Sequence, residues 1–316
     1  MIYKYLNKFS LLFLIVIFTN NVNIAQSSLV SKNYKSLSHL RELAYTKQIS
    51  KINPLDKDIN YPILSAVGLS YAFIIYEIND YYRNTWWSSE SSSFHIVNDW
   101  EYALWLDKFG HAYGTTLISH FFSSGFQAAN VNDELSTWLG AVGGFGMQLY
   151  VEVQDGYGPN WGFSPGDAVS DFVGASYFVA RYYYPYLNNF QLRVSYFPSE
   201  AFLNGKKPDN NISDDYDGQK MWLAFRMKNL LPENLSKYWP SFLMISAGYG
   251  VKGIGENATT EGLKPSYYLA LDLDASEIPL HGEFWEFLKN TLNYFHFPMP
   301  GIKVSEDGIS FLLIAY

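Results

Sequence analysis

Six acidic and histidine side chains occur at spacings that would bring them together in pairs on helices. The pairs are Asp107 with His111, Glu152 with Asp155, and Asp167 with Asp171. Side chains three or four residues apart lie on the same face of an α-helix. Residues 109–180, which hold two of the three pairs, contain no lysine or arginine. A carboxylate buried there without a cationic partner must be protonated, bind a metal ion or stay open to water.

If the three helix faces converge, they form a pocket of five carboxylates and one imidazole. Oxygen and imidazole ligands suit a divalent metal ion. The candidate metal ligands are Asp107, His111, Glu152, Asp155, Asp167 and Asp171. The same pocket could transfer protons, with His111 as the base and a carboxylic acid of raised pKa opposite it. The candidate catalytic residues are Asp107, His111, Glu152 and Asp171, and the sequence contains no phosphate loop and no dinucleotide fingerprint in the expected context.

Two of the acidic residues have a simple structural explanation. Ser164 and Asp167 have the spacing of a capping box, with Pro165 at the first helical position, so Asp167 could serve only to start a helix. Asp155 is followed by glycine and could belong to a turn.

The other residues have structural alternatives of their own. Asp107 could pair with Lys108 on the surface, and His111 could be a hydrogen-bonded histidine of the core. Glu152 is the hardest to explain in this way because it lies within apolar sequence. His120 follows His111 by nine residues, which is not the same helical face, so we interpret it as structural.

Four apolar helices are predicted to position these residues. Pro62–Ile78 is almost unbroken apolar sequence, long enough for a helix that is buried in protein or inserted in a membrane. Apolar residues recur at helical spacing over Asp99–Gln127. Asn132 is the predicted N-cap of a third helix that ends at Asp155, and a fourth helix covers Ala168–Tyr184.

From residue 188 onward the apolar period changes to two, which predicts β-strands. The expected strands are Gln191–Phe197, Lys220–Met227, Phe242–Tyr249, Tyr267–Asp274 and Ser310–Tyr316, with one helix at Glu283–Tyr294. The predicted fold class is therefore α+β: an N-terminal hydrophobic four-helix bundle over residues 61–186, followed by a mostly antiparallel β region over residues 187–316.

The N-terminal sequence predicts export. Lys4 and Lys8 precede the apolar run Leu11–Phe18, and polar residues follow it, which is the layout of a secretory signal peptide over residues 1–26. Residues 27–60 form a polar lead-in to the helical region. The expected location is the cell envelope, in the periplasm or associated with the outer membrane.

Composition narrows the function classes. None of the 316 residues is a cysteine, which excludes disulfides, thiolate metal sites and a lipid carried on cysteine. The formal net charge of -8 argues against nucleic acid as a partner. Aromatic residues make up 18% of the chain, which favours contact with a membrane interface or a glycan. The mean hydropathy of -0.09 is too low for a helical protein with many membrane spans.

Three motifs in order carry a resemblance to a known family. They are Asp107–Tyr113, Glu152–Gly156 and Gly162–Asp167, the last followed by Asp171 and Gly174. They resemble the YfiM-like family of bacterial envelope proteins, which is itself similar to the VanZ-like membrane proteins. The resemblance implies a domain of unknown function in the envelope, with the six candidate residues at the family's polar positions.

We therefore expect an exported envelope protein in which the carboxylate and histidine cluster acts on a membrane lipid or a lipid-linked glycan. The alternative is a non-catalytic structural or assembly factor that meets an envelope protein partner. A second alternative is an outer-membrane β-barrel protein, because the chain ends on an apolar strand with Tyr316 as its last residue. Whether the protein is an enzyme is left open by the sequence.

Overall fold

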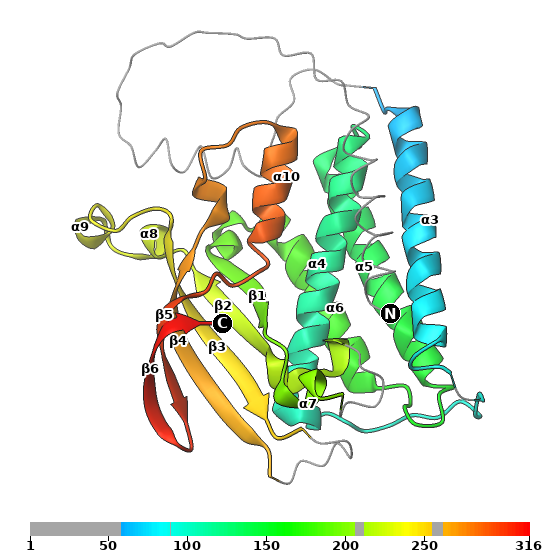
Figure 1. Cartoon of the computed structure of the whole chain (residues 1–316). Helices are drawn as coiled ribbons and strands as arrows, with labels where there is room; N and C mark the ends of the chain where they lie inside the picture. The colour runs from blue at the N-terminus through cyan, green and yellow to red at the C-terminus, as the bar shows by residue number, and fades with distance from the viewer. Residues whose placement is uncertain (1–57, 89, 206–211, 255–261) are drawn as a thin grey trace.

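Most of the long helices precede the strands along the chain, so the α+β class is confirmed. The computed structural model describes residues 58–88, 90–205, 212–254 and 262–316 (Figure 1). The predicted signal peptide and most of the polar lead-in lie outside the described residues. The longer helices are α3 (Tyr61–Arg83), α4 (Leu106–Ala128), α5 (Asp133–Asp155), α6 (Pro165–Tyr183) and α10 (Glu283–Leu292). The short helical turns are η1 (Tyr102–Trp105), η2 (Pro185–Asn189), α7 (Glu200–Leu203), η3 (Ile212–Asp214), η4 (Tyr216–Gly218), α8 (Met227–Leu230), α9 (Glu233–Ser236) and η5 (Ala275–Glu277).

Three of the apolar helices pack directly on one another. α4 contacts both α5 and α6, and α5 contacts α6. α3 lies at the edge of this group (Figure 1), and Val67 is its one buried residue. It is held to α4 by the Tyr71 hydroxyl, which donates to the carbonyl oxygens of Phe121 and Phe122 at 2.9 Å. The expected bundle of four packed helices is thus not confirmed. By length and composition, α3 could cross a membrane.

Glycines let the three helices approach closely. A methyl group at Gly174 on α6 would collide with the backbone carbonyl of Ala112 on α4, and one at Gly144 on α5 would collide with Ser119 on α4. Because α4 and α6 lie so close together, the Thr116 hydroxyl on α4 can donate to the Gly174 carbonyl oxygen on α6 at 3.0 Å. These contacts set the narrow spacing between α4 and its neighbours.

α4 begins later than its apolar pattern predicts, at Leu106 instead of Asp99. The three residues before it, Ala103, Leu104 and Trp105, have φ angles of 50°, 50° and 72°. This left-handed region costs about 1–2 kcal/mol for each residue with a side chain. The turn is held by the Tyr249 hydroxyl, which donates to the Leu104 carbonyl oxygen at 2.9 Å. Apolar spacing cannot reveal such a turn because it carries no information on the sign of φ.

Six strands form one antiparallel sheet in sequence order. They are β1 (Phe190–Tyr196), β2 (Gln219–Phe225), β3 (Leu243–Lys252), β4 (Lys264–Leu273), β5 (Met299–Ser305) and β6 (Gly308–Ala315). The five predicted strands correspond to all of these except β5. The sequence analysis missed β5 because Pro300 and Gly301 indicate a turn. The strand accommodates them through a register shift between Met299 and Gly301.

The sheet curls so that its two ends approach each other. The free edge of β1 forms a parallel bridge with the segment before β5, between Val194 and Phe295. The ring of Tyr316, after β6, lies 4.7 Å from the ring of Phe197, after β1. The curl encloses one face of the sheet, which we call the inner face.

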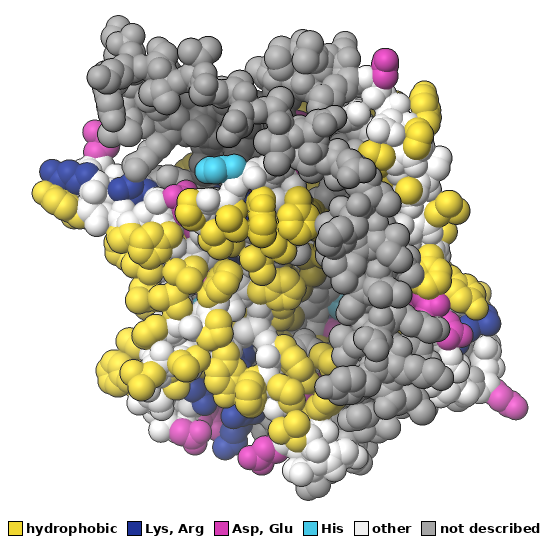
Figure 2. Space-filling model, turned by 45° about the horizontal axis from the view of Figure 1, so that its top comes forward, with side chains coloured by type: hydrophobic (Ala, Val, Ile, Leu, Met, Phe, Trp, Pro, Cys, Tyr) yellow, Lys and Arg dark blue, Asp and Glu magenta, His cyan; other side chains and the backbone are white. Residues whose placement is uncertain are grey.

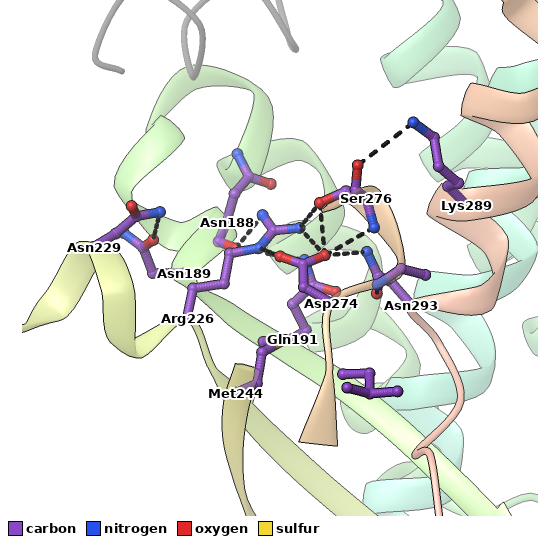
Figure 3. A network of polar contacts seen from close by, with 12 residues as sticks. Asn188, Asn189, Gln191, Arg226, Asn229, Met244, Asp274, Ser276, Lys289 and Asn293 are labelled. Carbon is purple, nitrogen blue, oxygen red and sulfur yellow. Dashed lines mark hydrogen bonds and ion pairs between the residues drawn. The ribbon is translucent and has the colours of Figure 1, made fainter. Parts of the chain in front are cut away.

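The inner face is buried and carries charged and polar side chains beside a small apolar cluster that includes Trp222 and Tyr268. Arg193 and Asp272 are both 0% exposed, and the Arg193 guanidinium donates to the Asp272 carboxylate at 2.7 Å. A second ion pair ties β2 to the segment after β4, since Arg226 Nε donates to Asp274 Oδ2 at 2.5 Å (Figure 3). The Asn293 amide donates to the same carboxylate at 2.9 Å. These ion pairs satisfy the charged groups that the curl removes from water.

The opposite face of the sheet is apolar and packs on α4 through β1, β2 and β3. Leu106 and Tyr113 of α4 share a core with Met221 of β2 and with Val251 of β3. α4 therefore lies between the other helices and the sheet, and contacts both.

We predict that the α4–α6 contact tolerates no side chain at residue 174. Gly174→Ala should lower the free energy of unfolding by about 1–3 kcal/mol. The new methyl group would collide with the backbone carbonyl of Ala112, which can move only if the α4 backbone moves with it. Gly146→Ala on α5 is the matched control, since nothing lies within 4 Å of a methyl group there. This control should be neutral or stabilising by about 1 kcal/mol, from helix propensity. Urea unfolding followed by circular dichroism measures both, and equal effects would contradict the close contact.

Candidate metal centre

The six predicted residues lie at one end of the three packed helices. α4 and α6 begin at this end and α5 finishes there (Figure 1). Asp107 and His111 belong to the first turns of α4, Glu152 and Asp155 to the last turn of α5, and Asp167 and Asp171 to the first turns of α6. The structure thus brings five of the six predicted residues together, namely Asp107, His111, Glu152, Asp167 and Asp171, and leaves Asp155 at the border.

His111 is at the centre of the cluster. Its Nε2 atom faces three carboxylate oxygens from three helices: Asp107 Oδ1 at 3.8 Å, Glu152 Oε1 at 3.9 Å and Asp167 Oδ1 at 3.6 Å. These separations are too long for hydrogen bonds. They are slightly wider than the roughly 3–3.5 Å that separates neighbouring ligand atoms around an ion bound at about 2.1 Å. The ligand atoms of Asp107, His111 and Asp167 lie within 4.8 Å of one another, as do those of His111, Glu152 and Asp171, so a small cation could lie against His111 in either set.

The other nitrogen of the His111 ring is held by Asp171. His111 Nδ1 lies 3.2 Å from Asp171 Oδ1, which also accepts from the Thr115 hydroxyl at 2.8 Å and from the Gln148 amide at 3.3 Å. Asp171 is 0% exposed, and its second oxygen has no hydrogen-bond partner among the described residues. A carboxylate on one ring nitrogen fixes the imidazole so that the other nitrogen points at a metal ion.

Lys108 lies beside the cluster and was not predicted as part of it. Its ammonium group is 2.7 Å from Asp107 Oδ2, 2.7 Å from Asp167 Oδ1 and 3.1 Å from Asp99 Oδ1. The Lys108 side chain is only 5% exposed. Its pair with Asp107 is therefore buried, and is not the surface pair that the sequence left open as an alternative. Lys108 directly follows Asp107 in the sequence, and this position could have indicated that it belongs to the cluster.

The helix cap at the start of α6 involves a residue from α5. The Ser164 hydroxyl accepts from the Asp167 backbone N–H at 3.1 Å, as the capping box predicts. The reciprocal bond is made by Glu152, whose Oε2 accepts from the Ser164 backbone N–H at 3.2 Å. The Asp167 carboxylate is thus free of the cap and turns toward Lys108 and His111. Glu152 fixes the start of α6 with one oxygen and faces His111 with the other.

Asp155 and Tyr216 lie at the border of the cluster. Asp155 Oδ1 accepts from the Trp87 indole at 2.6 Å, and Asp155 is not among the groups whose ligand atoms lie within 4.8 Å of one another. Tyr216 comes from η4, far along the chain, and its hydroxyl donates to Asp107 Oδ1 at 2.5 Å. The sequence analysis missed Tyr216 because no spacing relates it to α4.

The electrostatics of the cluster favour bound protons at neutral pH. Burial works to lower the pKa of His111, but the hydrogen bond with Asp171 and the nearby carboxylates outweigh it and raise that pKa to about 10. Burial raises the pKa of Glu152 to about 8 and that of Asp167 to about 7. Burial also acts to raise the pKa of Asp107, but His111 and the adjacent lysine hold it below its usual range. At neutral pH His111 is therefore cationic and Glu152 is protonated.

We predict that Glu152 makes the protein less stable as pH rises from about 4.5 to about 8. Between these values the unfolded chain releases the Glu152 proton and the folded protein keeps it, so unfolding becomes more favourable with increasing pH. Glu152→Gln mimics the protonated form and should weaken this dependence, by a few kcal/mol at most over that range. Urea unfolding at several pH values with a chelator present measures the slope.

Glu134→Gln is the control for this measurement, since Glu134 lies at the other, exposed end of α5. Its slope should match that of the wild-type protein. A Glu152→Gln slope equal to the wild-type slope would mean that Glu152 is ionised in the folded protein at neutral pH.

One sequence family matches the region that holds the cluster. It is described as "Predicted periplasmic lipoprotein (DUF2279)" and matches residues 97–183, less than half of the chain. A search of curated proteins finds no match, and a search of solved structures finds none. The description names a lipoprotein, whereas none of the 316 residues is a cysteine that could carry the lipid. The likeness to YfiM-like and VanZ-like proteins stays a prediction. The match agrees with the location expected from the sequence: the chain is an exported cell-envelope protein that contains a domain of unknown function.

Proposed function

We propose that the cluster binds a divalent metal ion through His111, Asp107, Glu152 and Asp167. The observation that carries this proposal is the His111 Nε2 atom, which faces one carboxylate oxygen from each of the other three residues at 3.6–3.9 Å. Asp171 positions the imidazole from the opposite side. A mixed set of imidazole and carboxylate ligands suits Zn²⁺, Mn²⁺ or Fe²⁺.

The charge balance supports a cation at this position. Two cationic side chains, Lys108 and His111, face carboxyl groups of five residues, namely Asp99, Asp107, Glu152, Asp167 and Asp171. Protons bound to carboxyl groups reduce the excess negative charge, as the raised pKa values of Glu152 and Asp167 indicate. A divalent ion would replace these protons and the proton on His111 Nε2.

For the substrate we propose a membrane lipid or a lipid-linked glycan. The helices that carry the cluster also expose apolar side chains: Phe109 is 53% exposed, and Phe172 and Val173 are 60% and 54% exposed. Helices that combine exposed apolar side chains with a polar cluster suit a ligand that has both kinds of group. A bound ion would polarise a phosphoryl or carbonyl oxygen of such a substrate.

A structural role is the second candidate, and Lys108 favours it. The Lys108 ammonium group already links α4 to α6 through Asp107 and Asp167 at 2.7 Å. A cluster that only locks the helices together would need no further cation. Metal binding therefore distinguishes the two functions.

We predict that the purified protein binds one Zn²⁺ or Mn²⁺ ion and releases about two protons per ion near pH 7. Calorimetry in buffers of different ionisation enthalpy measures both numbers. His111→Ala should weaken binding by about 100-fold or more, because it removes the central ligand. Asp171→Asn should weaken it by about 10-fold to 100-fold, because it releases the imidazole.

His281→Ala is the matched control, since His281 is exposed and lies outside the cluster. It should bind the ion as the wild-type protein does. If neither cluster variant changes metal binding while both stay folded by circular dichroism, the cluster is structural and the proposal fails.

A further inference from the structure

The sheet covers one of its edges and leaves the other open. At β1, the Val194 backbone N–H donates to the Tyr294 carbonyl oxygen at 3.0 Å, and the Val194 carbonyl oxygen accepts from the His296 backbone N–H at 2.9 Å. β6 forms the other edge, on the side of the sheet away from the long helices (Figure 1). In the described part of the chain, the hydrogen bonds of β6 go only to β5. The backbone groups of β6 that point away from β5 are therefore free to pair with another strand.

The side chains of β6 are apolar and largely exposed. Ile309, Phe311 and Leu313 are 68%, 83% and 88% exposed, and Ile314 is 59% exposed. Leu312 points the other way and packs against the small apolar cluster of the inner face. The strand contains no charged residue and no proline, which are the residues that commonly keep an edge strand from pairing. Figure 2 shows hydrophobic side chains over much of the side of the molecule on which the sheet lies, with charged side chains below them.

A strand fits this edge better than a lipid does. Hydrocarbon could cover the apolar side chains, but it would leave the N–H and C=O groups of the edge without hydrogen-bond partners, which is costly for every group. A β-strand from another polypeptide pairs with the backbone and covers the side chains in one contact.

We propose that β6 pairs with β6 of a second copy of this chain, so that two sheets join edge to edge in a two-fold dimer. A strand that pairs with its own copy across a two-fold axis runs antiparallel to it. Residues opposite each other in such a pair point to the same side of the joined sheet, so Ile309, Phe311 and Leu313 meet the same three side chains of the second copy. Because β6 carries no charged residue, the pairing places no like charges opposite each other.

The apolar surface of β6 has the size of a reversible interface. A largely exposed leucine, isoleucine or phenylalanine side chain presents on the order of 100 Å² to water. The four such side chains of β6 and its backbone therefore offer roughly 500 Å² on each copy. This is less than the roughly 800 Å² per partner of a standard interface and lies in the range of transient complexes. The dimer should therefore dissociate on dilution.

Sedimentation equilibrium of the full-length exported chain tests the pairing. The wild-type chain should show a monomer–dimer equilibrium that shifts to monomer on dilution. Phe311→Lys brings two like charges together in the middle of the paired strands and should raise the dimer dissociation constant about tenfold or more. Leu235→Lys is the matched control, because Leu235 is 53% exposed on α9, outside the sheet, and it should dimerise as the wild-type chain does.

Cysteine cross-linking locates the interface. The chain has no cysteine of its own, so each single substitution introduces one thiol. Residues paired across antiparallel strands lie about 4.5–5.5 Å apart at their Cα atoms, which a disulfide can span. Under mild oxidation, at least one of Ile309→Cys, Phe311→Cys and Leu313→Cys should form a covalent dimer, and Leu235→Cys should stay monomeric.

The proposal is overturned if the wild-type chain stays monomeric up to roughly 100 μM, or if Phe311→Lys dimerises as Leu235→Lys does. It is also overturned if the monomer binds phosphatidylglycerol vesicles and Phe311→Lys abolishes that binding, because β6 would then face lipid. Should Phe311→Lys not fold, the cysteine variants decide, and failure of all three to cross-link overturns the proposal. None of these residues belongs to the metal centre, so the outcome is independent of metal binding.

Discussion

The close contact between α4 and α6 is the constraint on which the rest of the structure depends. Where Gly174 meets the backbone of α4, the helices are near enough for Thr116 to donate across the gap, and Thr115 reaches Asp171 in the same way at 2.8 Å. One turn further, the same narrow spacing brings side chains as short as aspartate to His111 from two helices. A wider spacing would leave room for water between the carboxylates, and the raised pKa values that depend on burial would be lost.

Much of this cluster could be predicted because its residues lie on three long helices whose ends are marked in the sequence. Asn132 and Ser164 cap α5 and α6 as predicted, and these caps fix which turn each acidic residue occupies. The partners of those residues could not be predicted in the same way. Glu152 completes a cap on another helix, and Tyr216 reaches Asp107 from a different part of the chain. Both contacts depend on packing between elements, which no local pattern encodes.

The sheet shows the same limit in another form. Alternation identified β4 as a strand, with Leu269 on one face and Asp272 on the other. Alternation could not tell which face of β4 is enclosed. Apolar residues are usually buried and charged residues exposed, but here Asp272 is 0% exposed and Leu269 is 54% exposed. The reason is that Arg193 and His296 supply partners for Asp272 on the inner face. β5 was missed because proline and glycine are uncommon within strands, so Pro300 and Gly301 indicated a turn.

The hydrogen bond from Tyr216 to Asp107 bears on how the chain folds. The family match ends at residue 183, so a polypeptide limited to the matched region would leave Asp107 with the charge of Lys108 but without its hydroxyl donor. The core shared by Leu106 and Met221 adds to the same dependence. The helices and the β region are thus joined at the cluster, and we expect that loss of the sheet would also loosen the contacts around Asp107.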